Sequence, residues 1–262
     1  MAEPLPQIER SNEGCGILME TMEYRNPLIA ELYDVANPWG PDAEFYASLA
    51  GQPPRHVLDL GCGTGVFALG LAERGHRVTA VDPAVPMLEV AKRKPHAERV
   101  EWVEASAQSY RSTKRFDLIV MMGHAFQCLL TDTEMLGALE TMHLHLKPDG
   151  RVAFETRNPR IDWRREWAGR PPRKLMLEAG EVIEKLEVES DEGEFVSFRT
   201  HYGFSDRTLT TASRLRFLSK EHVAKLMAQA GLTVVEVFGD WDGSAFDAAR
   251  SREIILIAER VV

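Results

Sequence analysis

A short apolar stretch that runs directly into three alternating glycines, at residues 57–65, constrains this chain more than any other feature. It reads Val-Leu-Asp-Leu-Gly-Cys-Gly-Thr-Gly, and its first residues favour a β-strand. Glycine tolerates positive φ and lets a ligand touch bare backbone, while a helix starting just afterwards presents unpaired amides. The stretch predicts a strand, a ligand-binding turn and a helix. A turn that recruits glycine for steric reasons alone is the simpler alternative.

Spacing and charge distinguish this turn from a dinucleotide-binding one. Asp59 precedes the first glycine, and Gly65 follows Gly63 by two residues. A dinucleotide turn needs its third glycine one position later, and an acid inside the strand would repel a pyrophosphate. Residues 77–82 predict a second strand that ends in Asp82, whose carboxylate can accept both hydroxyls of a ribose. The pattern favours a ligand with a ribose and with positive charge or further hydroxyls.

These features resemble the class I S-adenosylmethionine-dependent methyltransferases. The resemblance rests on residues 59–65, 82–88, 104–107 and 116–120. Within that family the chain is most similar to small-molecule enzymes with an antiparallel insert after the fifth strand, as in amino-sugar N-methyltransferases. The resemblance implies S-adenosyl-L-methionine as cofactor, S-adenosyl-L-homocysteine as product, and methyl transfer to a nitrogen or oxygen of a small-molecule acceptor.

Alternating strand and helix patterns predict an α/β fold. We expect a Rossmann-like, doubly wound sheet with helices on both faces, and the resemblance implies seven strands with the last one antiparallel. The core would comprise residues 26–159, including lid helices at its start, and 219–262, after an N-terminal tail at 1–25. Period-two patterns at 181–189, 194–202 and 209–217 predict an antiparallel insert within 160–218, which shapes the substrate site or forms a dimer contact. Residues 147–150 predict a turn before a strand at 151–156.

Ligands of such sheets bind at the carboxyl ends of the strands, so the loops that follow the strands define the expected site. Met87 is expected against the adenine face, with ordinary core packing as the alternative. Ser106 departs from many relatives, which have an Asp there that reads the adenine amino group. Together with the resemblance, this rule implies that the cofactor-binding residues are Tyr33, Asp59, Gly61, Cys62, Gly63, Gly65, Asp82, Pro83, Met87, Ser106, Ala107, Met122 and Gly123.

His124 follows the fourth strand and is the candidate general base, because an unperturbed imidazole accepts a proton near neutral pH. A hydrogen-bonded structural histidine is the alternative. Arg157, at the end of the fifth strand, can hold a substrate carboxylate or pair with a nearby acid. Tyr46, Phe126 and Trp241 complete the expected substrate contacts. An ordinary core aromatic is the alternative for Tyr33 and Tyr46, and a solvated loop with one anchoring tryptophan is the alternative for Trp241.

Composition narrows the possible partners. A net charge of −9, from 31 basic and 40 acidic residues, argues against nucleic-acid binding. No apolar run approaches the roughly 20 residues that cross a bilayer, and residues 1–14 are too polar for a signal peptide. We expect a cytoplasmic monomer or homodimer without membrane attachment.

Three widely spaced cysteines without a CxxC pair predict neither a disulfide framework nor a metal site. Two other functions stay open. An NAD-dependent oxidoreductase is disfavoured by Asp59 and by the glycine spacing. A methyltransferase-like protein that binds the cofactor without turnover is compatible with the same glycine turn.

Overall fold

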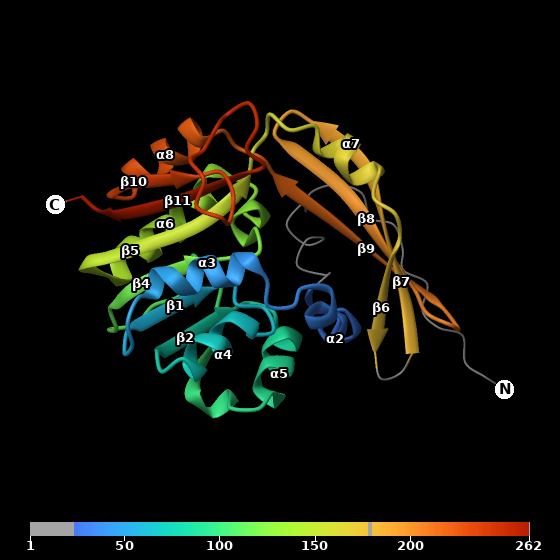
Figure 1. Ribbon diagram of the computed structural model, residues 1–262, viewed down its shortest axis with the longest axis horizontal. Coiled ribbons are helices and arrows are strands. Elements are labelled where there is room, and N and C mark those ends of the chain that lie inside the picture. Colours follow the sequence, from blue (N-terminus) through green and yellow to red (C-terminus); the bar gives the residue numbers. More distant parts are fainter. Residues whose placement is uncertain (1–23, 178–179, 262) are drawn as a thin grey trace.

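The computed structural model describes residues 24–177 and 180–261. The predicted tail at 1–25 therefore lies outside the described residues, apart from Tyr24 and Arg25. Two β-sheets stand next to each other, one flanked by helices and one forming an arched wall at its side (Figure 1).

The first sheet has seven strands in the order β10-β11-β5-β4-β1-β2-β3. The strands β1 to β5 run parallel, whereas β11 is antiparallel to both β5 and β10. This arrangement confirms the predicted doubly wound core. The strand bounds are β1 His56–Leu60, β2 Arg77–Asp82, β3 Val100–Glu104, β4 Phe116–Met121, β5 Leu146–Arg157, β10 Leu232–Phe238 and β11 Glu253–Arg260.

One predicted boundary is wrong. Residues 147–150 do not form a turn before the fifth strand, because β5 already begins at Leu146, which pairs with Phe116 of β4. Both of these side chains are buried, and a register irregularity after Phe116 accommodates the extra residues. Burial of an apolar pair thus extends the ladder through a segment whose sequence favours a turn.

Helices cover both faces of the core sheet (Figure 1). Helices α3 and α4 pack on one face and α6 and α8 on the other, because alternate strand residues point to opposite faces. No helix in the described part of the chain is long and apolar enough to span a membrane. The helix bounds are α2 Pro27–Ala36, α3 Pro41–Ala50, α4 Val66–Glu73, α5 Val85–Arg93, α6 Asp132–His145 and α8 Lys220–Gln229, with 3₁₀ turns η1 Ala97–Arg99 and η2 Ala125–Cys128.

Local capping explains where several helices start. Asn26 accepts a hydrogen bond from the amide of Leu28, and Pro27 opens α2. Thr131 and Glu134 form a complete capping box at the start of α6. Ser219 caps α8, as its sequence predicts.

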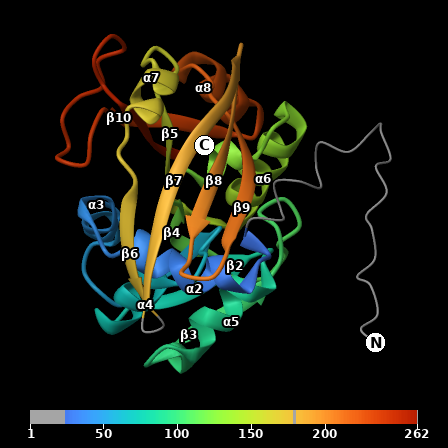
Figure 2. The ribbon, with the colours of Figure 1, turned by 90° about the vertical axis from the view of Figure 1, so that its right-hand side faces the viewer.

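The second sheet is the antiparallel insert, with the order β6-β7-β8-β9. Its strands are β6 Arg173–Leu177, β7 Gly180–Glu192, β8 Phe195–Gly203 and β9 Thr208–Arg216, and helix α7 Trp163–Ala168 precedes them. The predicted insert is confirmed, but α7 and β6 were missed because their arginines resemble solvated loops. Figure 2 shows these strands crossing in front of the core.

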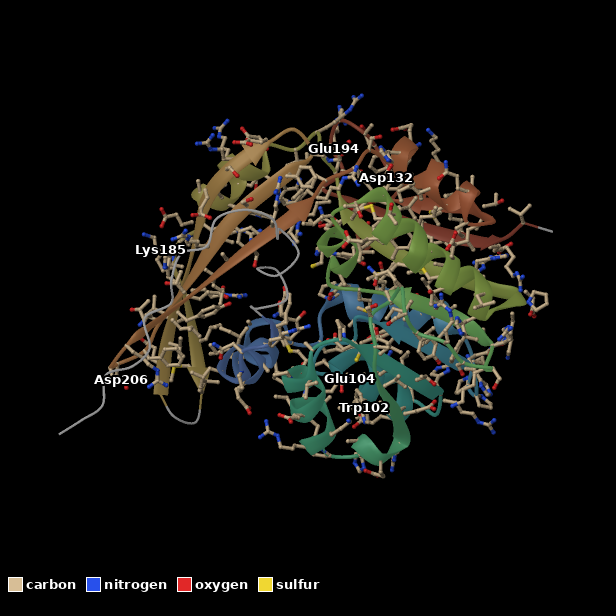
Figure 3. All side chains as sticks on the ribbon, turned by 180° about the vertical axis from the view of Figure 1, so that it is seen from behind. Trp102, Glu104, Asp132, Lys185, Glu194 and Asp206 are labelled. Atoms are coloured by element: carbon tan, nitrogen blue, oxygen red, sulfur yellow. The ribbon has the colours of Figure 1, made fainter. Side chains whose placement is uncertain are left out.

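Arg216 fixes the insert to the core. Its side chain is buried and donates to Glu194 from the β7–β8 hairpin (2.8 Å) and to Asp132 at the start of α6 (2.7 Å). Figure 3 shows Asp132 and Glu194 close together at this junction, whereas Lys185 and Asp206 lie far out on the insert. The junction between the insert and the core is therefore held by charge-assisted hydrogen bonds.

We expect Arg216→Met to lower the free energy of unfolding by about 2 kcal/mol, because hydrogen bonds to charged groups contribute about 1.5–3 kcal/mol. Urea denaturation measures this difference. Lys174→Met is the control, since Lys174 forms only an exposed ion pair with Glu181 and its loss should cost under about 0.5 kcal/mol. Equal effects of the two substitutions would contradict the role of Arg216 in fixing the insert to the core.

Candidate functional site

A cavity of about 910 Å³ opens between the carboxyl ends of the core strands and the inner face of the insert. The glycine turn and the loop after β4 form its floor, and helix α2 forms one side. Residues of β7, β8 and β9 form the opposite wall, among them Glu184, Leu186, Phe198, Thr200 and Tyr202. The site thus combines a polar floor with a largely apolar wall.

The glycine turn has a backbone that only glycine adopts easily. Gly61, Gly63 and Gly65 have φ values of +75°, +54° and +76°. A side chain at Gly65 would also overlap the ring of Trp102. Asp82 fixes the turn, because one carboxylate oxygen accepts from the amide of Gly63 (2.8 Å) and the other from that of Ala84 (2.8 Å).

Asp59 lies at the base of the same turn and lines the cavity. Only 2% of its surface is exposed, and its Oδ2 atom has no hydrogen-bond partner in the part of the chain that the structure describes. Burial, together with the nearby Asp82 carboxylate, raises the pKa of Asp59 to about 7. An unsatisfied carboxyl in this position suits a ligand that brings a positive charge or a hydroxyl.

Helix α2 covers the turn with Tyr33. Its ring lies 3.5 Å from the point where a Cβ of Gly63 would be, and its hydroxyl 3.6 Å from the corresponding point of Gly123. Burial, with Asp82 as the next cause, raises the pKa of Tyr33 far above its usual value. Asp34 holds the helix in place, accepting from the Thr64 hydroxyl and pairing with Lys94 (2.5 Å).

A histidine and two carboxylates meet beside the loop after β4. His124 has a positive φ of 60°, and its amide donates to Oε1 of Glu155 (2.6 Å). Its Nε2 atom lies 2.8 Å from Oε2 of Glu253. The hydroxyl of Tyr46 donates to the other oxygen of Glu155 (2.5 Å), and burial raises the pKa of Glu155.

Two arginines face the cavity without a close acid. Arg157 donates to the side-chain oxygen of Gln127 (3.0 Å) and lies over the rings of Trp163 and Trp167. Neither Arg157 nor Arg170 has a carboxylate within 4.0 Å among residues 24–177 and 180–261. Burial lowers the pKa of both guanidinium groups, which stay charged, so this end of the cavity attracts anions.

The structure brings about half of the predicted site residues to the cavity wall: Tyr33, Asp59, Gly61, Cys62, Met122, Gly123, His124 and Arg157. Ten others lie outside this lining: Tyr46, Gly63, Gly65, Asp82, Pro83, Met87, Ser106, Ala107, Phe126 and Trp241. Met87 is buried in a cluster with Ala30 of α2, and Ser106 bonds to Ser109. Helix α2 thus separates the expected adenosine side from the open cavity.

The three aromatic residues expected to contact substrate have other partners. Phe126 is buried and packs on Phe154. Trp241 packs against Phe45 and Tyr46. Aromatic packing describes the observed contacts of Phe126 and Trp241, and Tyr46 also donates a hydrogen bond to Glu155.

Sequence reasoning missed Glu155 and Glu253, which contact His124, and Arg170, which lines the cavity. Glu155 lies two residues before Arg157 and is a visible strand-end acid, so its position could have suggested a role. Nothing in the sequence connects Glu253 with His124, because 129 residues separate them. Whether Arg170 and the residues of the insert reach the cavity depends on how the second sheet lies against the core, which no local pattern in the sequence indicates.

Comparison with known proteins identifies the family. A family model described as a methyltransferase domain matches residues 57–150. Over 238 residues the chain is 32% identical to a cypemycin N-terminal methyltransferase from a Streptomyces species, covering 88% of this chain and 95% of that relative. The chain belongs to the class I S-adenosylmethionine-dependent methyltransferases. The methyltransferase uses S-adenosylmethionine, and this assignment replaces the oxidoreductase alternative.

Other relatives agree with the assignment. A glycine/sarcosine N-methyltransferase from Aphanothece halophytica is 26% identical over 201 residues, which cover 75% of this chain and 73% of that relative. The CcbJ methyltransferase from Streptomyces caelestis has the same fold, with a TM-score of 0.75 at 23% identity over 93% of this chain and all of that one. The sugar N-methyltransferase KedS8 from a Streptoalloteichus species gives 0.73 at 16% identity over 99% of both chains.

The residues of the methyltransferase fit the cofactor. The unsatisfied oxygen of Asp59 matches a cationic ligand, and the bare turn at Gly61 leaves backbone open to it. When bound, S-adenosylmethionine supplies a methyl group that its sulfonium has already activated. The protein therefore needs only to align the acceptor, exclude water and remove a proton.

We expect Asp59→Asn to stabilise the ligand-free methyltransferase at pH 8 and to weaken cofactor binding. The native carboxyl keeps its proton up to about pH 7, whereas the unfolded chain loses it near 3.8. Stability of the wild type therefore falls as pH rises between these values, by up to about 1.4 kcal/mol per pH unit. The asparagine side chain does not ionise, so the variant does not lose this stability as the pH rises.

Urea denaturation at pH 5 and pH 8 measures the effect, and calorimetry gives the cofactor affinity. Asp149→Asn, in an exposed segment, is the control. A variant with the same pH dependence of stability as the wild type would refute the role given to Asp59.

Proposed function

We propose that this methyltransferase methylates an amine nitrogen of a small-molecule acceptor that also carries a carboxylate or phosphate. The observation that carries the proposal is His124, which lines the cavity next to the glycine turn and is held from behind by the buried carboxylates of Glu155 and Glu253. A histidine between two carboxylates suits an acceptor that arrives as an ammonium. The similar proteins are named as a cypemycin N-terminal, a glycine/sarcosine and a sugar N-methyltransferase, and these names support the same class.

The cofactor side would be formed by the core at residues 26–159 and 219–262. Asp59, Gly61 and Cys62 would contact the methionine end, with Tyr33, Met122 and Gly123 around the sulfur. Asp82 would bind the ribose while still fixing the turn, since each carboxylate oxygen has a second lone pair. Pro83, Met87, Ser106 and Ala107 would surround the adenine once α2 moves away from Gly63.

The acceptor side would be formed by the insert at 160–218. Arg157 and Arg170 would bind the anionic group, because neither has a carboxylate within 4.0 Å in the described ranges. Bidentate pairing of a guanidinium with a carboxylate or phosphate would fix the acceptor's orientation. Tyr46 would act through Glu155, not by touching the acceptor.

Alignment is expected to supply most of the rate acceleration. Positioning of two reactants contributes about 7–11 kcal/mol in favourable cases, whereas a general base contributes about 10²- to 10⁴-fold. His124 would accept the proton of the acceptor ammonium, and the apolar wall at Leu186 and Phe198 would keep water away.

The oligomeric state of the protein, a monomer or homodimer, and its cytoplasmic location stay predictions.

We expect Gly63→Val and Asp82→Asn each to weaken S-adenosylmethionine binding at least tenfold. A side chain at Gly63 would meet Tyr33, and the Asp82 amide would present hydrogens to backbone amides that need an acceptor. Isothermal calorimetry measures the affinity, with Asp149→Asn as the control. Unchanged affinity in both variants would refute the cofactor site.

Methyl transfer from labelled cofactor to matched probes tests the acceptor class. Alanyl-alanine offers an amine and a carboxylate, its C-terminal amide lacks the carboxylate, and lactyl-alanine replaces the amine by a hydroxyl. Glucosamine 6-phosphate and glucosamine form a second pair. We expect transfer to the amines that carry an anionic group, with KM at least tenfold higher for the amines that lack it. Preferred transfer to lactyl-alanine would contradict N-methylation.

A further inference from the structure

The imidazole of His124 is held from outside its own loop by a residue of the last core strand. Its Nε2 atom lies 2.8 Å from Oε2 of Glu253, and the side chain of Glu253 is only 12% exposed. Its Nδ1 atom has no hydrogen-bond partner among the residues that the structure describes, and the nearest carboxylate oxygen, Oε1 of Glu155, is 4.0 Å away. The two ring nitrogens therefore have different environments.

The core sheet explains why these groups meet. Glu253 begins β11 and pairs directly with Arg157 on the antiparallel neighbour β5. Glu155 lies two residues before Arg157, so all three side chains share one face of the sheet. The loop after β4 brings His124 to this face, because the Glu155 carboxylate binds its backbone amide. Position on the sheet, not nearness in sequence, assembles the cluster.

We propose that Glu253 is the positioning residue of the methyltransferase, orienting His124 so that its Nδ1 atom takes the proton of the acceptor ammonium. This inference rests on the proposed function. An ionised Glu253 accepts only, so the neutral imidazole carries its hydrogen on Nε2 and keeps the lone pair on Nδ1. Glu253 thereby selects one tautomer, as a carboxylate does for a histidine in other acid-base sites.

The acceptor ammonium gives one proton to Nδ1 of His124, which leaves a neutral amine with a free lone pair. That lone pair forms the bond to the methyl carbon while the carbon–sulfur bond breaks and its electrons go to sulfur. The product is a methylated ammonium, and His124 later releases its proton to water.

The charges around His124 favour this direction of transfer. Glu155 on β5 and Glu253 on β11 both stabilise an imidazolium. The guanidinium of Arg157 on β5 opposes this stabilisation, because it lies close enough to both carboxylates to interact with them electrostatically. Tyr46 on α3 donates to Glu155, and the partly buried Tyr33 of α2 stays protonated and neutral. Two carboxylates against one guanidinium leave the environment net negative.

A purely structural role is the competing explanation, in which Glu253 only anchors the loop after β4. Such an anchor would make the same hydrogen bond and select the same tautomer, so Glu253→Gln, whose side-chain oxygen can still accept from Nε2, would keep the kcat and the pH profile of the wild type. The two explanations therefore differ in the kinetics of Glu253→Gln, whereas the tautomer, observed without any ligand, tests whether Glu253 orients the ring at all.

Nitrogen-15 NMR of histidine-labelled, ligand-free methyltransferase tests the proposal. His124→Gln assigns the ring signals by their loss. We expect the neutral ring to be protonated at Nε2 in the wild type and in Glu259→Gln, a matched control further along β11. In Glu253→Ala we expect a mixture of both tautomers. A wild-type ring protonated at Nδ1, or an unchanged tautomer in Glu253→Ala, overturns the proposal.

Kinetics with alanyl-alanine give a second readout. Glu253→Gln keeps the size of the side chain and removes its charge, so folding and cofactor affinity by calorimetry should match the wild type. We expect kcat to fall at least tenfold and the acidic limb of kcat/KM to move to lower pH by about one unit, since an imidazolium without its carboxylate loses its proton more readily. An unmoved limb with normal kcat overturns the role of Glu253.

The proposed function and the positioning role of Glu253 can fail independently of each other. A wild-type enzyme that ignores every amine probe refutes the proposed function, whatever the state of the ring. A loss of the tautomer preference in Glu253→Ala supports the positioning role even in that case, because no acceptor takes part in the NMR measurement.

Discussion

The two backbone hydrogen bonds that the Asp82 carboxylate accepts are the interaction on which the site depends. Asp82 ends β2 and binds the amides of Gly63 and Ala84, so one carboxylate joins two adjacent strand ends. The positive φ values of the turn are tolerated because glycine has no side chain to clash. With this turn fixed, Asp59 lies beneath it with an unsatisfied oxygen, and the cavity has a floor that favours a cation.

Charge is distributed along the cavity in a way that matches the chemistry of the family. Acids lie at the cofactor end and around His124, where a sulfonium and an ammonium would meet. Arginines without a close acid lie towards the insert, where an anionic group of the acceptor would be bound. Burial strengthens each of these electrostatic preferences, since a low dielectric weakens screening.

Two additions to the core, helix α2 and the insert, close this cavity in different ways. Helix α2 packs on the glycine turn through Tyr33 and is tied to the core by Asp34. The insert is bonded to the core at its junction by Arg216, and it contributes the apolar wall. Helix α2 also packs against the insert through Ile29 and Leu32, so the two covers support each other.

The sequence by itself determined the core fold, the glycine turn and its acids, because strand periodicity and glycine spacing are local properties. His124 and Arg157 could be placed at the site because carboxyl ends of parallel strands share one edge. Only the tertiary structure decided that Glu253 meets His124, that Arg170 faces the same cavity, and that Phe126 and Trp241 pack outside the cavity lining. These contacts join distant segments, and their geometry depends on strand order and on how the insert folds back, neither of which a local pattern encodes.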